Sequence, residues 1–233
     1  MSNQRTNPPR VILFDFDGTL VNTTPLILRS FRATWKKMFG FEMEDAAYIN
    51  TFGTLLHTAL KGLTEQCIAD GRICNVDDLT AMADELLRTY RAFNNEWHDQ
   101  AIEPFDGIDE TLQELRARDF KLGIVSSKMR LGVERGLNVF AMAELFDVII
   151  TADDVTNHKP HPEPLLKALD QINAATHEAI YVGDSIHDIA AGRAANIATV
   201  AAAWGPFPKA DLEALKPDHL LDEPGELLRL FGE

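Results

Sequence analysis

Short apolar runs recur along the chain, and each of them stops at small or polar residues. Five have the length and composition of buried strands: VILFDF (11–16), KLGIVSS (121–127), FDVIITADD (146–154), AIYVGD (179–184) and ATVAAAWG (198–205). Between the later runs, apolar residues return every three or four positions, over 109–118 and 164–171, which predicts helices. Strands that alternate with helices predict βαβ units and therefore an α/β fold, a parallel sheet with helices on both faces.

The interval between the first two strands is far longer than one crossover helix needs. Helical spacing of apolar residues is clear within it, over 26–39 and 78–98. Pro104 and Gly107 then mark the return to the α/β pattern. We therefore expect an all-helical insertion above the carboxyl ends of the strands, where open α/β sheets bind ligands. The predicted domains are a disordered tail (1–9), an α/β core (10–21 and 104–233) and a helical cap (22–103).

The charge of the chain restricts its partners. Its 233 residues carry a formal net charge of −14. This argues against sequence-independent nucleic-acid binding, because that mode needs a basic face to neutralise phosphates. An acidic protein that acts on an anionic substrate needs a metal ion or a local basic cluster instead.

Other features of the chain bear on its location. The polar start MSNQRTNPPR lacks the apolar stretch of a signal peptide, and no apolar run approaches the roughly 20 residues of a membrane span. The only cysteines, Cys67 and Cys74, favour reduced thiols over a disulfide. We therefore expect a cytoplasmic protein without membrane association, as a monomer or a weak homodimer.

Polar residues with useful chemistry follow the predicted strands. In chain order they are Asp15, Asp17, Ser126, Ser127, Lys159, Asp184 and Asp188. Because the carboxyl ends of parallel strands share one edge of the sheet, we expect these groups to meet in one crevice. Ser185 is placed to cap the helix that would begin after Asp184.

The residue types at this edge indicate phosphoryl chemistry. Asp15, Asp17 and Asp184 need a compensating cation, and Mg²⁺, which prefers oxygen ligands, fits them. Asp15 is then a candidate nucleophile, since a carboxylate can accept a phosphoryl group. Asp17 points to the same side and is a candidate to give a proton to the leaving oxygen and later to take one from water. Ser126 and Lys159 are candidates to contact the transferring phosphoryl oxygens.

These residues also form an ordered set of four motifs. DFDGT (15–19), Ser126 at a strand end, Lys159 before a proline, and GDSIHD (183–188) resemble the motifs of the haloacid dehalogenase-like hydrolases. The resemblance extends over residues 10–205 and implies a Rossmann-like core with an inserted helical cap.

The resemblance also implies roles for individual residues. Asp15 would be the nucleophile and Asp17 the general acid/base. Mg²⁺ would be bound by the Asp15 carboxylate, the Asp17 backbone carbonyl and Asp184. Asp188 would support the metal from behind these ligands or orient Lys159.

Within this family, Asp17 favours phosphoryl transfer, because the family's dehalogenases lack a second aspartate. Ile27 stands where the related sugar phosphomutases carry a histidine, which favours water as the final acceptor. The chain further resembles the phosphoglycolate phosphatase group, and YRAFNNEWHD (90–99) and TADDVTNHKPHPEP (151–164) resemble segments of a bacterial pyrophosphatase. We therefore expect a Mg²⁺-dependent phosphatase whose substrate is a small phosphorylated anion or inorganic pyrophosphate.

Other functions remain open at this point. A phosphoglycolate or sugar-phosphate phosphatase would use the same chemistry, and a phosphomutase or a catalytically silent phosphate-binding module would keep the same fold. The chain also departs from the family pattern at Asn22, where an acid is frequent, and at Ser127, where asparagine is frequent. The second departure affects how phosphate would be held.

The helical insertion offers two candidate substrate contacts. Arg91, Asn94 and His98 are spaced to share one helix face, which is either a solvated flank or an edge that contacts the substrate. Gly53 and Thr54, in the turn NTFGTLLH, are the second candidate, because glycine permits a close approach.

Overall fold

The computed structural model describes residues 9–74 and 76–232 of the chain. They divide into two compact units: an α/β unit, made of the chain up to Asn22 and from Glu103 onward, and a helical unit, Thr23–Ile102. Each boundary lies one residue from its predicted position. The predicted tail, residues 1–9, lies outside the described residues apart from Pro9.

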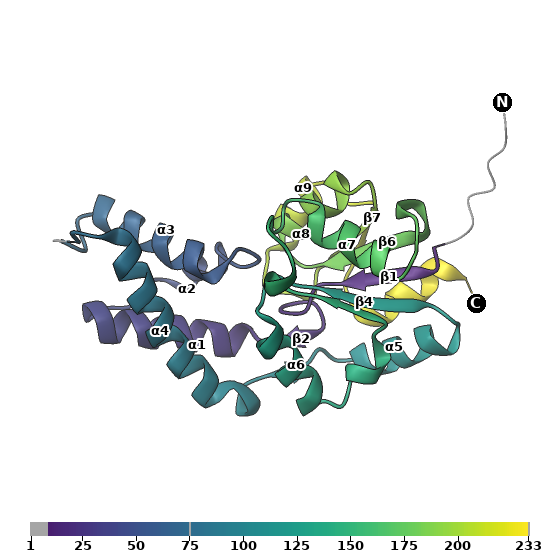
Figure 1. The fold of residues 1–233 in the computed structure, drawn as a ribbon, viewed down its shortest axis with the longest axis horizontal. Coiled ribbons are helices and arrows are strands. Elements are labelled where there is room, and N and C mark those ends of the chain that lie inside the picture. Colours follow the sequence, from purple (N-terminus) through teal and green to yellow (C-terminus); the bar gives the residue numbers. More distant parts are fainter. Residues whose placement is uncertain (1–8, 75, 233) are drawn as a thin grey trace. The chain divides into compact units, whose positions relative to one another are not determined.

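A six-stranded parallel sheet forms the centre of the α/β unit (Figure 1). Its strands are β1 (Val11–Phe14), β4 (Lys121–Val125), β5 (Val148–Ile150), β6 (Ala179–Gly183), β7 (Ala198–Ala202) and β8 (His219–Leu221), in the order β5-β4-β1-β6-β7-β8. Strand β1 lies between β4 and β6, and all four of its residues are buried. A strand covered on both faces reads as a continuous apolar run, which is the pattern of VILF.

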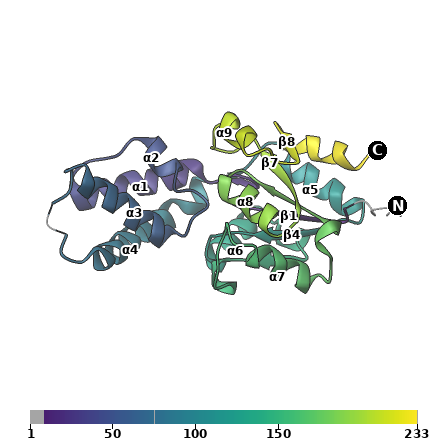
Figure 2. The same ribbon diagram turned by 90° about the horizontal axis from the view of Figure 1, so that it is seen from above.

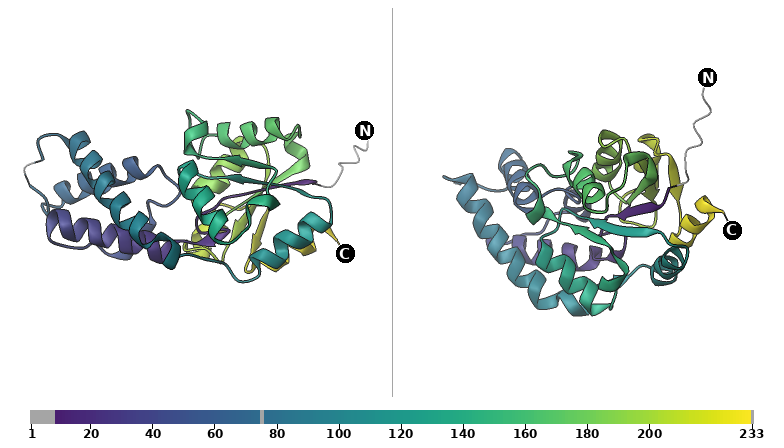
Figure 3. Two further views of the ribbon diagram at one scale, coloured as in Figure 1. Left: turned by 60° about the horizontal axis from the view of Figure 1, so that its bottom comes forward. Right: turned by 45° about the vertical axis from the view of Figure 1, so that its right-hand side comes forward.

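Helices cover both faces of this sheet, as expected. They are α5 (Ile108–Ala117), α6 (Arg130–Val139), α7 (Glu163–Gln171), α8 (Ile186–Ala194) and α9 (Lys209–Ala214), followed by the 3₁₀ segment η5 (Pro224–Phe231). Helices α7 and α8 lie above the sheet in Figure 1 and α5 lies below it. The apolar cluster under α7 and α8 joins Leu13 of β1 and Tyr181 of β6. On the other face, η5 packs against α5, and the two run side by side in both views of Figure 3. The Phe120 and Phe231 rings, whose centroids are 4.6 Å apart, pack together there.

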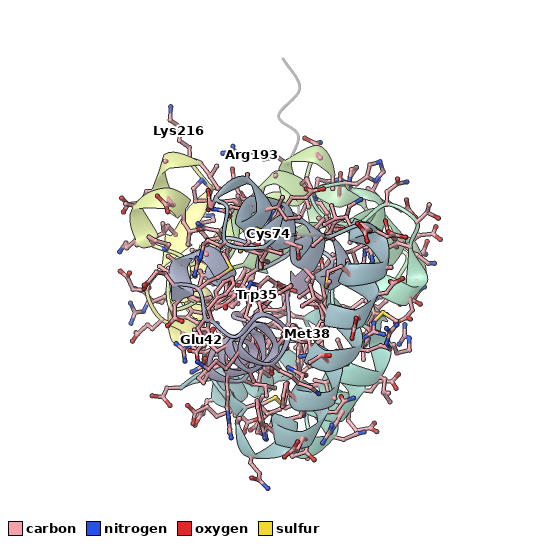
Figure 4. All side chains as sticks on the ribbon, turned by 90° about the vertical axis from the view of Figure 1, so that its left-hand side faces the viewer. Trp35, Met38, Glu42, Cys74, Arg193 and Lys216 are labelled. Atoms are coloured by element: carbon pink, nitrogen blue, oxygen red, sulfur yellow. The ribbon has the colours of Figure 1, made fainter. Side chains whose placement is uncertain are left out.

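The helical unit contains α1 (Thr24–Phe39), α2 (Asp45–Ile49), α3 (Leu56–Ala69), α4 (Leu79–Trp97) and the 3₁₀ turn η1 (His98–Gln100). Helix α4 packs against α1 and α3 (Figure 2). Its first turn is capped by the Asp78 carboxylate, which accepts hydrogen bonds from the N–H groups of Thr80 and Ala81. The core of the unit is aromatic: Phe31 stacks on Tyr48 at 4.9 Å, and both lie near the fully buried Trp35 (Figure 4).

The two cysteines belong to this helical unit, and both are free thiols, as predicted. Cys67 is buried in the aromatic core, while Cys74 is exposed (Figure 4). In the part of the chain that the structure describes, no helix is long and apolar enough to cross a membrane.

Some elements lie outside the sequence pattern. A two-residue ribbon, β2 (Val21–Asn22) with β3 (Glu103–Pro104), joins the two ends of the insertion by antiparallel pairing. Strand β8 closes the sheet edge. Both ribbon strands and β8 are too short to show a period, which explains why periodicity did not find them.

A stability prediction follows from the position of Leu13 in the centre of β1. Leu13 is fully buried between the flanking strands and the α7–α8 layer. Leu13→Ala removes this packing and leaves a cavity, so we expect the free energy of unfolding to fall by about 2–5 kcal/mol. Urea denaturation measures it, with Leu166→Ala as the matched control, because Leu166 is 42% exposed on α7. Equal losses in the two variants would contradict the assigned core.

Candidate active site

The carboxyl ends of β1, β4 and β6 carry the predicted site residues. Asp15 directly follows β1, and its N–H donates to the Val182 carbonyl at 2.9 Å. Ser126 directly follows β4, and its N–H donates to the Ile150 carbonyl at 2.9 Å. Asp184 directly follows β6. All three side chains are buried, and the hydrogen bonds of the sheet continue through the backbones of Asp15 and Ser126.

Lys159 joins two of the carboxylates. Its Nζ lies 3.0 Å from Asp15 Oδ1 and 2.7 Å from Asp188 Oδ1, and it donates to the Tyr181 hydroxyl at 3.0 Å. The Lys159 side chain is 1% exposed, so its charge is taken fully out of water. A buried ammonium of this kind is stable only when carboxylates surround it. The predicted proximity of Lys159 to Asp15 is present in the structure.

Asp188 is held at both of its carboxylate oxygens. Oδ1 accepts from Lys159 and from the Tyr181 hydroxyl, the latter at 2.8 Å. Oδ2 accepts from the backbone N–H of Ser185 at 3.0 Å and from its hydroxyl. Ser185 caps helix α8 and forms a reciprocal capping box with Asp188. With four donors already in place, Asp188 is suited to orienting Lys159.

Burial and neighbouring charges shift the pKa values of the ionisable groups at the site. Burial raises the pKa of Asp15 to about 7, and the carboxylates of Asp188 and Asp17 add to this effect while Lys159 opposes it. Burial likewise raises the pKa of Asp184 well above its ordinary value. Burial opposes ionisation of Asp188 too, but Lys159, Ser185 and Tyr181 hold its pKa below the ordinary value. Lys159 keeps its proton, because Asp15 and Asp188 raise its pKa despite burial.

A divalent cation would satisfy these carboxylates. Among the described residues, oxygens of Asp15, Asp184 and Asp188 lie within 4.8 Å of one another. The loop after β1 closes on Asp184: the Thr19 hydroxyl donates to its Oδ1 at 2.9 Å, and a Cβ on Gly18 would lie 2.5 Å from its Oδ2. Since buried carboxylates in an oxygen-only set are the ligands that Mg²⁺ prefers, the residues fit that ion. Asp15 and Asp184 are the candidates to hold it, because Asp188 is already saturated.

Asp17 lies apart from the three clustered carboxylates. Its Oδ1 forms an ion pair with Lys128 Nζ at 2.7 Å. The Asp17 carboxylate is therefore not one of the clustered side chains, and its predicted part in the cation site finds no support there. The family resemblance implies a different ligand atom, the backbone carbonyl of Asp17.

The segment that carries Ser126 and Lys128 is anchored by the chain after β5. Arg130 pairs with Asp154 at 2.6 Å. Asp154 Oδ2 also accepts from the N–H and the hydroxyl of Thr151, at 2.8 and 2.7 Å. The Thr151 hydrogen bonds and Arg130 hold the pKa of Asp154 below its ordinary value, although partial burial opposes them. These contacts tie two neighbouring strand ends together.

The remaining predicted residues lie elsewhere. Ser127 is half-buried beside Ser126. Gly53, Thr54, Arg91, Asn94 and His98 all belong to the helical unit. Thr54 donates to the Thr51 carbonyl at 2.6 Å, in a turn where Gly53 has a φ of +82°. Substrate contact by any of them stays a prediction.

Arg91 and Asn94 lie on helix α4, and His98 directly follows its last residue. Helix α4 ends at Trp97, so His98 begins a 3₁₀ turn instead of continuing the helix. His98 is buried, Asn94 is half-buried and donates weakly to Ser30 Oγ at 3.3 Å, and Arg91 is exposed.

Sequence reasoning missed three residues of this site. Thr19 lies inside the DFDGT motif, and a hydroxyl beside two acids was a signal for it. Tyr181 is a polar-tipped side chain in an otherwise apolar strand, and its hydroxyl also donates to the Val125 carbonyl at 3.1 Å. Lys128 follows the two serines directly, but nothing in the sequence shows that it reaches Asp17.

Comparison with known proteins identifies the family. The family model of the haloacid dehalogenase-like hydrolases matches residues 12–202. The chain belongs to the haloacid dehalogenase-like hydrolases. Among curated proteins of this family, the pyrophosphatase PpaX of Bacillus cereus is 38% identical over 222 residues, which cover 95% of this chain and 96% of PpaX.

Solved structures of haloacid dehalogenase-like proteins agree with this assignment. A Lactobacillus plantarum protein assigned as a phosphoglycolate phosphatase is 30% identical, covers 97% of this chain and 100% of its own, and superposes with a TM-score of 0.82. A haloacid dehalogenase-like hydrolase from Bacteroides fragilis is 28% identical, with 94% and 99% coverage and a TM-score of 0.82. The chain is therefore a hydrolase with phosphatase and pyrophosphatase relatives.

The Asp154 anchor predicts a pH-dependent stability. The pKa of Asp154 is lower in the folded protein than its ordinary 3.8, so its contribution is complete above that value and is lost as the pH falls through the folded pKa. We expect Asp154→Asn to lower the free energy of unfolding by about 1–3 kcal/mol at neutral pH. The difference from the wild type should shrink as the pH falls below 3.8.

Urea denaturation at neutral and acid pH measures both effects. Asp170→Asn is the control, because Asp170 is exposed on α7 and no comparable loss is expected. A deficit for Asp154→Asn that stays constant down to the acid range would contradict the assigned ion pair.

Proposed function

We propose that the protein is a Mg²⁺-dependent phosphatase that hydrolyses inorganic pyrophosphate to two phosphates through a phospho-Asp15 intermediate. The observation that carries this proposal is the orientation of the buried Asp15 carboxylate. Its Oδ1 accepts from the Phe16 N–H at 2.7 Å and lies 3.0 Å from Lys159 Nζ. Both contacts fall on Oδ1, so Oδ2 is the oxygen placed for attack.

The residues around Asp15 divide the chemistry between them. In the first step, Asp15 Oδ2 forms a bond to phosphorus while the bond from phosphorus to the leaving oxygen breaks, and Asp17 gives that oxygen a proton. In the second step, a water oxygen bonds to the same phosphorus and Asp15 leaves, while Asp17 takes the proton from water. Ser126 donates to the phosphoryl oxygens, and the Lys159 ammonium, which is held by Asp15, Asp188 and Tyr181, supplies positive charge beside them.

The candidate cation supports both steps. Asp15 and Asp184 would hold Mg²⁺, which would supply positive charge that offsets the buried carboxylates and the substrate oxygens. We further propose that the helical unit acts as the cap that excludes bulk water during turnover. The oligomeric state and the location in the cytoplasm remain predictions.

Pyrophosphate is favoured as the substrate by the PpaX relatives, which match this chain over nearly their whole length. Phosphoglycolate is the second candidate, because the Lactobacillus plantarum structure assigned to that activity has the same fold over its whole chain. The two substrates share the chemistry and differ only in the leaving group.

A substrate panel tests the proposed preference. The kcat/KM values with Mg²⁺ are compared for pyrophosphate, phosphoglycolate, and several sugar and nucleoside monophosphates. We expect the highest value for pyrophosphate. Equal and weak activity on all compounds would overturn the pyrophosphatase assignment, and the highest value for phosphoglycolate would select the second candidate.

The nucleophile is tested by Asp15→Asn. Because an amide cannot form the acyl-phosphate bond, we expect phosphate release with Mg²⁺ to fall by about a thousandfold or more. Chelation of the metal with EDTA should abolish wild-type activity, and added Mg²⁺ should restore it. Asp211→Asn serves as the control, since Asp211 is exposed on α9. Substantial turnover by Asp15→Asn would show that the nucleophile lies elsewhere.

A further inference from the structure

Lys128 occupies a position at the site that neither its sequence context nor the roles proposed above explain. Its Nζ lies 2.7 Å from Asp17 Oδ1 and 5.3 Å from the centre of the Phe16 ring. The Lys128 side chain is 17% exposed, whereas that of Lys159 is 1% exposed. The Lys128 stem runs over Gly132, where a Cβ would stand only 2.8 Å from Lys128 Cε. A larger residue at 132 would push the lysine away.

The backbone of Lys128 is fixed on both sides. Its N–H donates to Ser126 Oγ at 3.2 Å, and its carbonyl accepts from the Ala152 N–H at 3.0 Å. Two residues later, the Arg130 N–H donates to the Asp153 carboxylate at 2.6 Å. The lysine is therefore aimed at Asp17 by an anchored loop, so its position is set before any substrate arrives.

The two lysines at this edge of the sheet differ in what they can still bind. Lys159 is 1% exposed and is enclosed by Asp15, Asp188 and Tyr181. Lys128 has a partly exposed side chain, and its ammonium pairs with the carboxylate that, in the proposed mechanism, protonates the leaving oxygen. Lys128 is thus a cation on the leaving-group side, whereas Lys159 belongs to the nucleophile.

We propose that Lys128 binds the negative charge of the leaving group and makes the enzyme prefer phosphate compounds whose leaving group is itself an anion. This inference rests on the proposed function, because it takes Asp17 as the proton donor to the leaving oxygen. In the resting protein, the Asp17 carboxylate neutralises Lys128. An ammonium has three N–H groups, so Lys128 can keep its contact with Asp17 Oδ1 and still donate to an anionic group such as the second phosphate of pyrophosphate or the carboxylate of phosphoglycolate.

A matched pair of substrates isolates this effect. Phosphoglycolate and its amide, in which the carboxylate is replaced by a neutral carboxamide, have the same phosphate ester and nearly the same size. We expect Lys128→Met to lower kcat/KM for phosphoglycolate by about tenfold or more relative to the amide. Pyrophosphate should behave like phosphoglycolate. Any effect of the substitution through Asp17 alone acts on both esters and cancels in the ratio.

Three variants complete the experiment. Lys128→Arg keeps the charge and should retain most of the preference, while Lys128→Gln should lose it as Lys128→Met does. Lys209→Met is the control, because Lys209 also pairs with an aspartate, Asp222, but on an exposed surface. Thermal unfolding shows which variants are folded. If Lys128→Met does not fold, the comparison of Lys128→Arg with Lys128→Gln tests the role of the charge.

The outcomes separate this inference from the proposed function. A ratio that Lys128→Met and Lys128→Gln leave unchanged would overturn the leaving-group role, even if both activities fell together. A wild-type enzyme that hydrolyses none of the phosphate compounds would instead overturn the proposed function. The leaving-group role is supported if Lys128→Met and Lys128→Gln lose the preference for phosphoglycolate over its amide while Lys128→Arg retains it.

Discussion

The ion pairs of Lys159 with Asp15 and Asp188 are the interaction on which the site depends. They place an ammonium and two carboxylates in the interior, where each alone would be costly. The arrangement is stable because Tyr181, Ser185 and the Phe16 N–H supply the remaining hydrogen bonds. The same network leaves Asp184 short of positive charge, and that deficit is what a divalent cation would fill.

The parallel sheet makes this arrangement possible. Asp15, Ser126 and Asp184 each follow a strand directly, and neighbouring strands in register bring them to one edge. Tyr181 reaches from β6 to the Val125 carbonyl of β4 and to Lys159, so the sheet interior contributes to the site as well. The chemistry is therefore built from strand ends, while the core beneath them keeps the spacing rigid.

Sequence reasoning reached the strand-end residues because an acid after a buried apolar run is a strong local signal. It found the fold class and, within one residue, the bounds of the insertion, since long periodic segments are the most readable. Sequence reasoning failed where tertiary contacts determine the position of a side chain. The burial of His98 just beyond α4 and the reach of Lys128 to Asp17, from a loop anchored by Arg130 and Asp154, both depend on tertiary contacts. Neither has a periodic or motif signature.

The net charge of −14 raises a difficulty for a protein that acts on anions, and the site geometry answers it. At physiological ionic strength, charges farther apart than about 8 Å are largely screened, so the acidic surface repels a small anion only weakly once it has entered. Attraction then depends on the cations within that range. The structure places Lys159 beside Asp15 and Lys128 beside Asp17, with the carboxylates of Asp15 and Asp184 able to hold a metal nearby. Under the proposed function, the acidic chain would bind a polyanion because these two cations lie at the strand ends that carry the proposed nucleophile and acid/base.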